Sequence, residues 1–287
     1  MRDIQILDCP EIGCPQVLLY VFIELCNAFH RNGHQILITR NISEISNNSI
    51  VLMGDTFRVK NSADLLNKIA PHAIYLGWYW HMQDTSSLKN FIHIHEDFKN
   101  NLDNRMEFYK SMKNSCPLLL RANEKPELVA TYQKDIKMDY CYMGWRYRPD
   151  MVPEKFQGLY HGVFDHNKFL PYDERKKMYL SSIFTLGFQS DENIANEHVS
   201  QRIFEGLAYG CVVISNSIPA CNQTDNIVEY ANSREELENK MSFYLENPEL
   251  IKKKQEQGYE FIKKYGTNHH AMNRIIEAIK ENTDIVI

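Results

Sequence analysis

Residues 197–216 read EHVSQRIFEGLAYGCVVISN, and this stretch decides the fold expected for the second half of the chain. Between Ile203 and Ala208 the apolar side chains fall on one side of a helix expected over 200–210, which ends at a glycine. The apolar run over 211–216 then has the length and composition of a buried strand. A helix that leads directly into such a strand is the repeating step of an α/β sheet.

The same alternation extends outward along the whole chain. Short apolar runs that indicate strands lie at 4–7, 35–40, 49–54, 73–80, 91–95, 117–123, 139–145, 158–162 and 182–188. Helical patterns lie at 15–34, 61–70, 102–113 and 173–180, followed by two helices that break near Asn247-Pro248 and a last helix over 268–283. We expect two α/β domains, residues 1–137 and 138–266, and a C-terminal helix, 267–287, that returns to the first domain. Ligands of such sheets bind at the carboxyl ends of the strands, here in a central cleft between the two domains.

Composition narrows the class of protein. The chain is 44% hydrophobic and 24% charged, as expected for a globular protein with a core. It has no apolar run near the ~20 residues of a membrane span and no secretory signal at its start. Its seven cysteines form no C-x-x-C pair, which favours reduced thiols and a cytoplasmic protein. The net charge of −5 argues mildly against a protein that coats nucleic acid.

Glu197 and Glu205 allow two interpretations. In the plainer one, an acid before the helix stabilises the helix dipole, and Arg202 pairs with Glu205 at the surface. In the other, the carboxylates accept hydrogen bonds from sugar or ribose hydroxyls, and the helix start at Ser200 binds a phosphate. Spacing alone favours the plainer interpretation, but the surrounding residues favour the second.

Those residues resemble the nucleotide-sugar-binding region of GT-B glycosyltransferases. Glu197, seven residues, then Glu205 and a glycine-ended helix are similar to the Glu-x7-Glu motif of glycosyltransferase family four, and SQRIFEGLAYG resembles a spore-protein glycosyltransferase-like group. Segments 158–171 and 180–192 resemble the strands and donor loop that precede this motif, and 9–38 resembles the family's opening loop, helix and strand. Two positions depart from the family pattern. Gly13 is a single glycine, and Gly206 replaces an alanine.

The resemblance implies two Rossmann-like domains that face a central cleft, with the donor bound by the second domain. Glu205 would bind the ribose hydroxyls and Glu197 the donor sugar, in a catalytic position. The donor diphosphate would be held without a metal by basic side chains, the helix start and the opening loop, through Arg146, Arg148, Lys155, Arg202, Ser200 and Gly13.

The first domain is expected to bring the acceptor. His95, Glu96 and Asp97 lie at the end of a predicted strand, and we expect all three on the acceptor side, with His95 and Asp97 as candidate catalytic residues. His93 and His95 share one face of that strand and could bind a metal, but no third ligand has a recognisable spacing. A strand-end histidine with an ordinary hydrogen bond is the favoured interpretation of each alone.

The sequence therefore predicts a retaining, metal-independent glycosyltransferase that moves a sugar from a nucleoside-diphosphate sugar, UDP-sugar favoured, to an acceptor hydroxyl. It requires no other cofactor. The acceptor is open between a glycan, a small molecule, a protein and a modified DNA base. The alternative outside enzymes is a catalytically inactive nucleotide-sugar-binding module. A dehydrogenase is less favoured, because no G-x-G-x-x-G follows the first strand.

Overall fold

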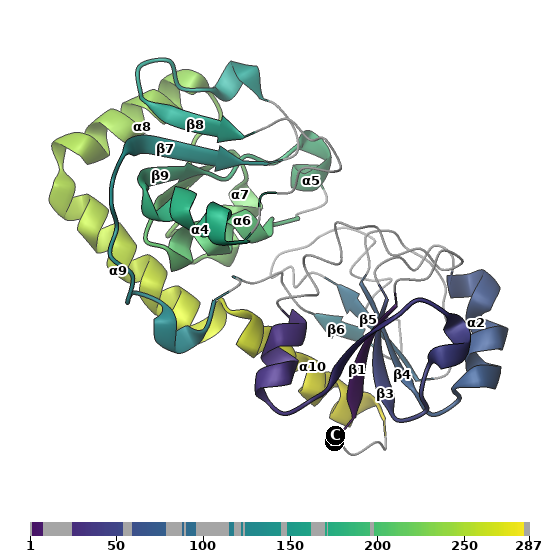
Figure 1. The fold of residues 1–287 in the computed structure, drawn as a ribbon. Helices are drawn as coiled ribbons and strands as arrows, with labels where there is room; N and C mark the ends of the chain where they lie inside the picture. The colour runs from purple at the N-terminus through teal and green to yellow at the C-terminus, as the bar shows by residue number, and fades with distance from the viewer. Residues whose placement is uncertain are drawn as a thin grey trace. The chain divides into compact units, whose positions relative to one another are not determined.

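The computed structural model describes residues 2–7, 25–53, 59–78, 88, 90–95, 115–117, 122, 124–144, 148–161, 170, 172–195 and 198–283. The chain divides into two compact units, of which unit 1 comprises Met1–Leu119 with Asn268–Ile287 and unit 2 comprises Leu120–Thr267 (Figure 1). The division at Leu120 comes earlier than the boundary expected at residue 138. The reason is a pairing inside unit 2, where Ala122 forms a parallel bridge with Thr267 and its N–H donates to the Gly266 carbonyl over 2.7 Å.

Unit 1 is built on a six-stranded sheet whose described pairs are all parallel, in the order β2-β1-β3-β4-β5-β6. The strands are β1 (Asp3–Leu7), β2 (Ile36–Thr39), β3 (Ser49–Met53), β4 (Ile74–Trp78), β5 (Phe91–His95) and β6 (Ser115–Pro117). β6 begins two residues before the run predicted at 117–123. β1 pairs with both β2 and β3, so the chain reverses its direction across the sheet beside β1.

Helices cover both faces of this sheet. α2 (Val59–Ile69) and the short helix η1 (Ile42–Glu44) pack with side chains such as Val51 and Tyr75 in one core cluster. α10 (Asn268–Asn282) contacts β5 and β6, and Figure 1 shows it on the side of the sheet away from α2. Residues 25–31 are also helical, and the helix is followed by Gly33 with φ of 90°, as its predicted stop requires.

Unit 2 contains a five-stranded parallel sheet in the order β11-β10-β9-β7-β8. Its strands are β7 (Met138–Met143), β8 (Gly158–His161), β9 (Ser182–Leu186), β10 (Val212–Ser215) and β11 (Glu229–Tyr230). The chain goes from β7 to β8 on one side, then returns past β7 to place β9 on the other. In a doubly wound sheet this reversal opens the crevice where ligands bind.

Alternating side chains of the unit 2 strands pack against different helices. On one face, Tyr140 and Phe184 pack with α8 (Arg234–Glu246) through Leu237 and Met241. On the other, Cys141 packs with α4 (Tyr172–Leu180). α6 (Gln201–Ala208) also lies on this second face. This two-sided cover is why the strands read as continuous apolar runs.

The remaining elements connect these layers. They are η2 (Pro126–Leu128), η3 (Pro149–Met151), α5 (Asp191–Ala195), α7 (Ile218–Gln223) and α9 (Pro248–Tyr265). The helix break predicted near Asn247-Pro248 is confirmed, since α8 ends at Glu246 and Asn247 is the cap residue between the two helices. Within the described residues, the helices are too short or too polar to traverse a lipid bilayer.

Candidate functional site

The carboxyl ends of β7 and β9 are joined by one arginine. The Nη1 group of Arg202, on the first turn of α6, donates to the Tyr142 hydroxyl on β7 over 3.2 Å. The same atom donates to the carbonyl of Phe188, just after β9, over 3.4 Å. Because β7 and β9 flank the reversal in strand order, Arg202 places a guanidinium at the edge where doubly wound sheets generally bind ligands.

A glycine makes room for this guanidinium. Gly144 directly follows β7, and a Cβ added there would lie 2.0 Å from Arg202 Nη1 and 2.3 Å from the Tyr142 hydroxyl. Arg202 also lies against the Tyr142 ring, with its guanidinium carbon 5.5 Å from the ring centre. The missing side chain at Gly144 therefore allows the cation to approach the strand end closely.

A buried polar network fixes the loop that leads into α6. The Gln189 side-chain amide donates to the Ser200 hydroxyl over 2.9 Å. Its backbone N–H donates to the Asn216 side chain over 2.8 Å, and the Asn216 amide returns a bond to the Gln189 carbonyl over 3.1 Å. Ser200 is the N-cap residue of α6 but makes no side-chain capping bond. Its hydroxyl thus holds the helix start against the β9 and β10 ends.

Glu205 lies inside the protein and is only 2% exposed. Its Oε2 atom accepts a hydrogen bond from the Tyr179 hydroxyl over 3.1 Å, and its Oε1 atom lies 3.5 Å from Nη2 of Arg175. This burial contradicts the surface position that the plainer interpretation of the sequence gave to Glu205. The two side chains leave α6 toward different partners, Arg202 toward the strand ends and Glu205 toward α4.

The phenol that binds Glu205 stays protonated. Burial raises the pKa of Tyr179 well above its usual value, and the nearby Glu205 charge raises it further. Tyr179 therefore remains a hydrogen-bond donor to Glu205 at neutral pH.

Arg148 follows β7, as expected, but its charge is already paired. Its guanidinium donates to both carboxylate oxygens of Asp150, over 3.3 and 3.1 Å, and lies 3.6 Å from Asp191. The hydrogen bond with Asp150 raises the pKa of Arg148 above its usual value. A phosphate would have to compete with two carboxylates for this group.

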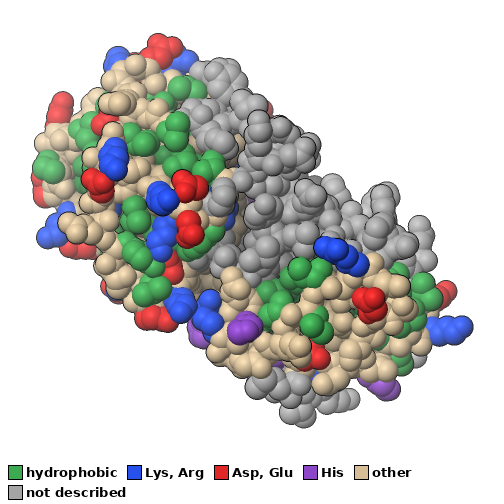
Figure 2. Space-filling view, in the orientation of Figure 1, with side chains coloured by type: hydrophobic (Ala, Val, Ile, Leu, Met, Phe, Trp, Pro, Cys, Tyr) green, Lys and Arg blue, Asp and Glu red, His purple; other side chains and the backbone are tan. Residues whose placement is uncertain are grey.

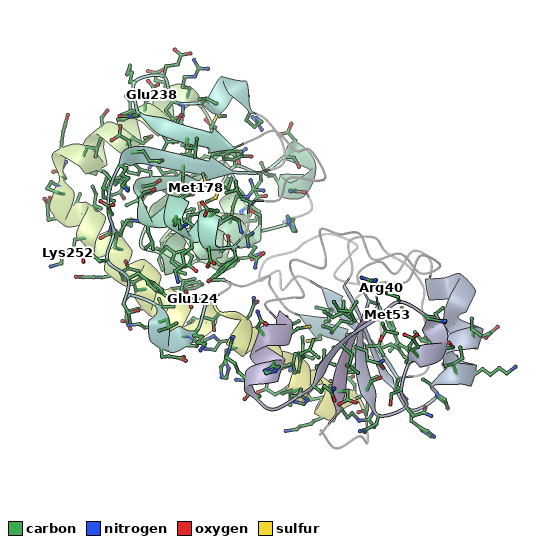
Figure 3. The ribbon with its side chains drawn as sticks, viewed as in Figure 1. Arg40, Met53, Glu124, Met178, Glu238 and Lys252 are labelled. Atoms are coloured by element: carbon green, nitrogen blue, oxygen red, sulfur yellow. The ribbon has the colours of Figure 1, made fainter. Side chains whose placement is uncertain are left out.

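Lys155 lies at the amino ends of the strands, whereas Arg202 lies at their carboxyl ends. Lys155 precedes β8 by three residues, is 74% exposed, and pairs with Glu238 of α8 over 3.1 Å. In Figure 3, Glu238 lies well apart from Met178 on α4. Because β7 and β8 are parallel, the chain must return to the amino ends of the strands before β8 begins at Gly158, and Lys155 lies on this return. The structure therefore separates Lys155 from Arg202.

Four predicted site residues fall outside the described part of the chain: Gly13, Asp97, Arg146 and Glu197. His95 is the last residue of β5 and pairs with Pro117 of β6. The described residues include no group of three or more His, Cys, Asp or Glu side chains arranged to hold a metal ion.

Sequence reasoning missed the contribution of α4. Besides Arg175 and Tyr179, this helix supplies Tyr172 and Lys176, which bind Oε2 of the buried Glu124 over 3.3 and 3.1 Å. The available signal was the polar and aromatic stripe at positions 172, 175, 176 and 179, one face of a helix. No periodicity links this stripe to Glu205, which lies 26 residues beyond Tyr179 in the chain.

Comparison with models of protein families assigns the chain to a family. The family model described as glycosyl transferase-like matches residues 126–277, which is more than half of the chain and includes nearly all of unit 2. The chain belongs to this family. The predicted resemblance to glycosyltransferases is thus confirmed for the broad class, and the protein is a glycosyltransferase.

Solved structures of low sequence identity share the fold over the full chain. A DNA-modifying β-glucosyltransferase, crystallised with and without uridine diphosphoglucose, has 13% identity and a TM-score of 0.57, and the match covers 98% of this chain and 100% of that one. An α-glucosyltransferase in complex with UDP and a 13-mer DNA containing an HMU base has 12% identity and a TM-score of 0.61, with coverage of 97% and 99%. These similarities confirm the predicted GT-B fold. Comparison with curated protein sequences found no match.

Proposed function

We propose that this glycosyltransferase uses a UDP-sugar donor, which binds at the carboxyl ends of β7 and β9. The observation that carries the proposal is the placement of Arg202 and Glu205 on one helix at the reversal of strand order. A cation at the strand ends suits a diphosphate, and a carboxylate one turn further along the helix suits ribose hydroxyls.

In this proposal Arg202 and the start of α6 stabilise the negative charge that develops on the departing diphosphate. Glu205 accepts hydrogen bonds from the ribose. Glu197, Arg146 and Gly13 keep the roles that the family resemblance implies, toward the donor sugar and the phosphates. Transfer is metal-independent and retains the configuration at the anomeric carbon.

Calorimetric titration with UDP, GDP, ADP and their sugar nucleotides tests the donor site. We expect UDP and a UDP-sugar to bind best, with affinity unchanged when EDTA is added. Failure of every nucleotide to bind a folded sample would contradict the proposal. With an active acceptor, NMR of the first-formed product distinguishes retention from inversion.

For the acceptor, the solved structures favour a hydroxymethylated base in DNA, because one similar enzyme modifies DNA and another was crystallised with HMU-containing DNA. The net charge of −5, and the acidic and basic side chains intermingled on the described part of the face shown in Figure 2, predict modest affinity for unmodified DNA. The acceptor is tested with short duplexes that contain one HMU base or, as a control, thymine at that position. Sugar transfer from radiolabelled UDP-glucose to each duplex is measured at low and at high salt. Sugar transfer to neither duplex, combined with transfer to a glycan or small molecule, would exclude the DNA acceptor.

We further propose that His95 and Asp97 act on the acceptor side, in a cytoplasmic protein whose described cysteines are free thiols. His95→Ala should lower kcat while the dissociation constant for UDP stays the same. Donor binding without transfer to any acceptor in the panel would instead indicate an inactive binding module.

A further inference from the structure

Two side chains on one face of α4, one cationic and one a hydrogen-bond donor, contact the two oxygens of Glu205 separately. Arg175 and Tyr179 are four residues apart, so they project from the same side of this helix. The Tyr179 hydroxyl binds Oε2 over 3.1 Å, while Nη2 of Arg175 lies 3.5 Å from Oε1. The carboxylate is therefore held at both ends of its plane by a neighbouring helix.

The contacts from Arg175 and Tyr179 compensate for the loss of water around the Glu205 carboxylate. A carboxylate buried as deeply as Glu205 loses its hydration, and positive charge and hydrogen bonds from the protein must replace the lost water. Arg175 brings that charge, and the Tyr179 phenol adds a neutral donor. An ionised carboxylate has about four acceptor positions, so protein donors and a ligand hydroxyl can bind it together.

The neighbouring cations of α4 have different partners. Lys176 binds Glu124 over 3.1 Å, and Lys177 is 72% exposed and pairs with Glu174 on its own helix. Among these three consecutive basic residues, Arg175 is the one whose described contacts include Glu205. A role for Arg175 at the site can therefore be tested against Lys177 as a matched control.

We propose that Arg175 and Tyr179 are positioning residues that hold the Glu205 carboxylate in the plane required by the ribose hydroxyls. They thereby set the preference of the donor site for ribonucleoside over 2′-deoxyribonucleoside diphosphates. This inference rests on the proposed function, in which Glu205 contacts the ribose. A freely rotating carboxylate would bind one hydroxyl as readily as two, whereas a fixed one favours the complete ribose.

The experiment compares UDP with 2′-deoxy-UDP by calorimetry. The variants are Glu205→Gln, Arg175→Met, Arg175→Lys, Tyr179→Phe and the control Lys177→Met. Wild type and the control should bind UDP about tenfold or more tightly than 2′-deoxy-UDP, as expected for loss of a hydrogen bond to a charged group. Arg175→Met and Tyr179→Phe should reduce this ratio toward one, and Arg175→Lys should restore part of it, because lysine keeps the charge but loses the guanidinium fork.

The possible outcomes separate the two proposals. If wild type binds no nucleoside diphosphate, the proposed function fails. If wild type and Lys177→Met show the ribose preference and Glu205→Gln abolishes it, but Arg175→Met and Tyr179→Phe keep it in full, the positioning role is wrong. A variant that loses affinity for both nucleotides equally has a structural effect only and also counts against the proposal. In the double variant of Glu205→Gln with Arg175→Met, the ribose preference should fall no further than in Glu205→Gln alone.

Discussion

Gly206 stands where the resembled family carries alanine, and its surroundings explain the difference. A Cβ at this position would lie 2.3 Å from the Cγ2 methyl of Thr185 on β9 and 3.0 Å from a methyl of Val213 on β10. The threonine is itself fixed, since its hydroxyl donates to the Cys141 carbonyl over 3.2 Å. A glycine at this position thus lets α6, the helix that carries Arg202 and Glu205, pack close to β9 and β10.

Gly206→Ala should destabilise the protein by about 1–3 kcal/mol through overpacking. Thr185→Ser removes the obstructing methyl and keeps the hydroxyl, so the double variant should recover part of this loss. Urea unfolding of the four proteins measures the coupling. Equal stability of Gly206→Ala and wild type would show that α6 moves freely away from the sheet.

Arg202→Met should weaken UDP binding by roughly tenfold or more, because a hydrogen-bonded charge is lost from the strand ends. Arg148→Met is the matched comparison, and its effect should be smaller, since Asp150 already neutralises that side chain. Calorimetry on the folded variants gives both values. A larger loss of UDP affinity in Arg148→Met than in Arg202→Met would indicate that Arg148, and not Arg202, binds the diphosphate.

β11, α8 and α9 meet at one carboxylate. Glu229 of β11 lies 2.8 Å from Lys240 of α8 and 2.6 Å from Lys254 of α9, and the Tyr244 hydroxyl donates to it over 2.8 Å. Burial alone would raise its pKa, but the two lysines and the phenol outweigh that effect and lower the pKa to about 2.

The lowered pKa of Glu229 gives a pH dependence with a definite sign. The ionised carboxylate binds protons less readily in the folded protein, so its contribution to stability is complete above the ordinary pKa of 4.5 and is lost as the pH falls toward about 2. Glu229→Gln should therefore be less stable than wild type at pH 7, and the difference should shrink below pH 4.5. Thermal unfolding at pH 7, 5, 4 and 3 measures it. A difference independent of pH would contradict the ionic role.

Sequence periodicity predicted most elements because buried strands and amphipathic helices carry their own patterns. The helix end at Gly33 and the break at Pro248 were located because each depends on one residue's backbone restriction. α5 and α7 were missed, since five or six residues give too few turns for a periodic signal. The motif singled out Glu205, whose role stays a prediction, whereas its partners on α4 depend on how two helices pack on β9 and β10.

α10 is the part of unit 1 that comes last in the chain. Its apolar side, which includes Ala271, Met272 and Ile275, is buried, and the helix contacts β5 and β6. Ile275→Ala should destabilise unit 1 by about 2–5 kcal/mol while the dissociation constant for UDP stays unchanged. Calorimetric unfolding with and without UDP separates the two units. Weakened UDP binding in the folded variant would contradict this prediction.

The bridge between Ala122 and Thr267 bears on the order in which the two units can fold. Unit 2 is a continuous insertion whose two ends pair with each other, whereas unit 1 is completed only by the segment after Thr267. During synthesis, all of unit 2 leaves the ribosome before α10 does, so unit 2 can finish folding first. Paired ends also make the insertion a natural module to excise and to join elsewhere, because a host chain needs only two adjacent attachment points.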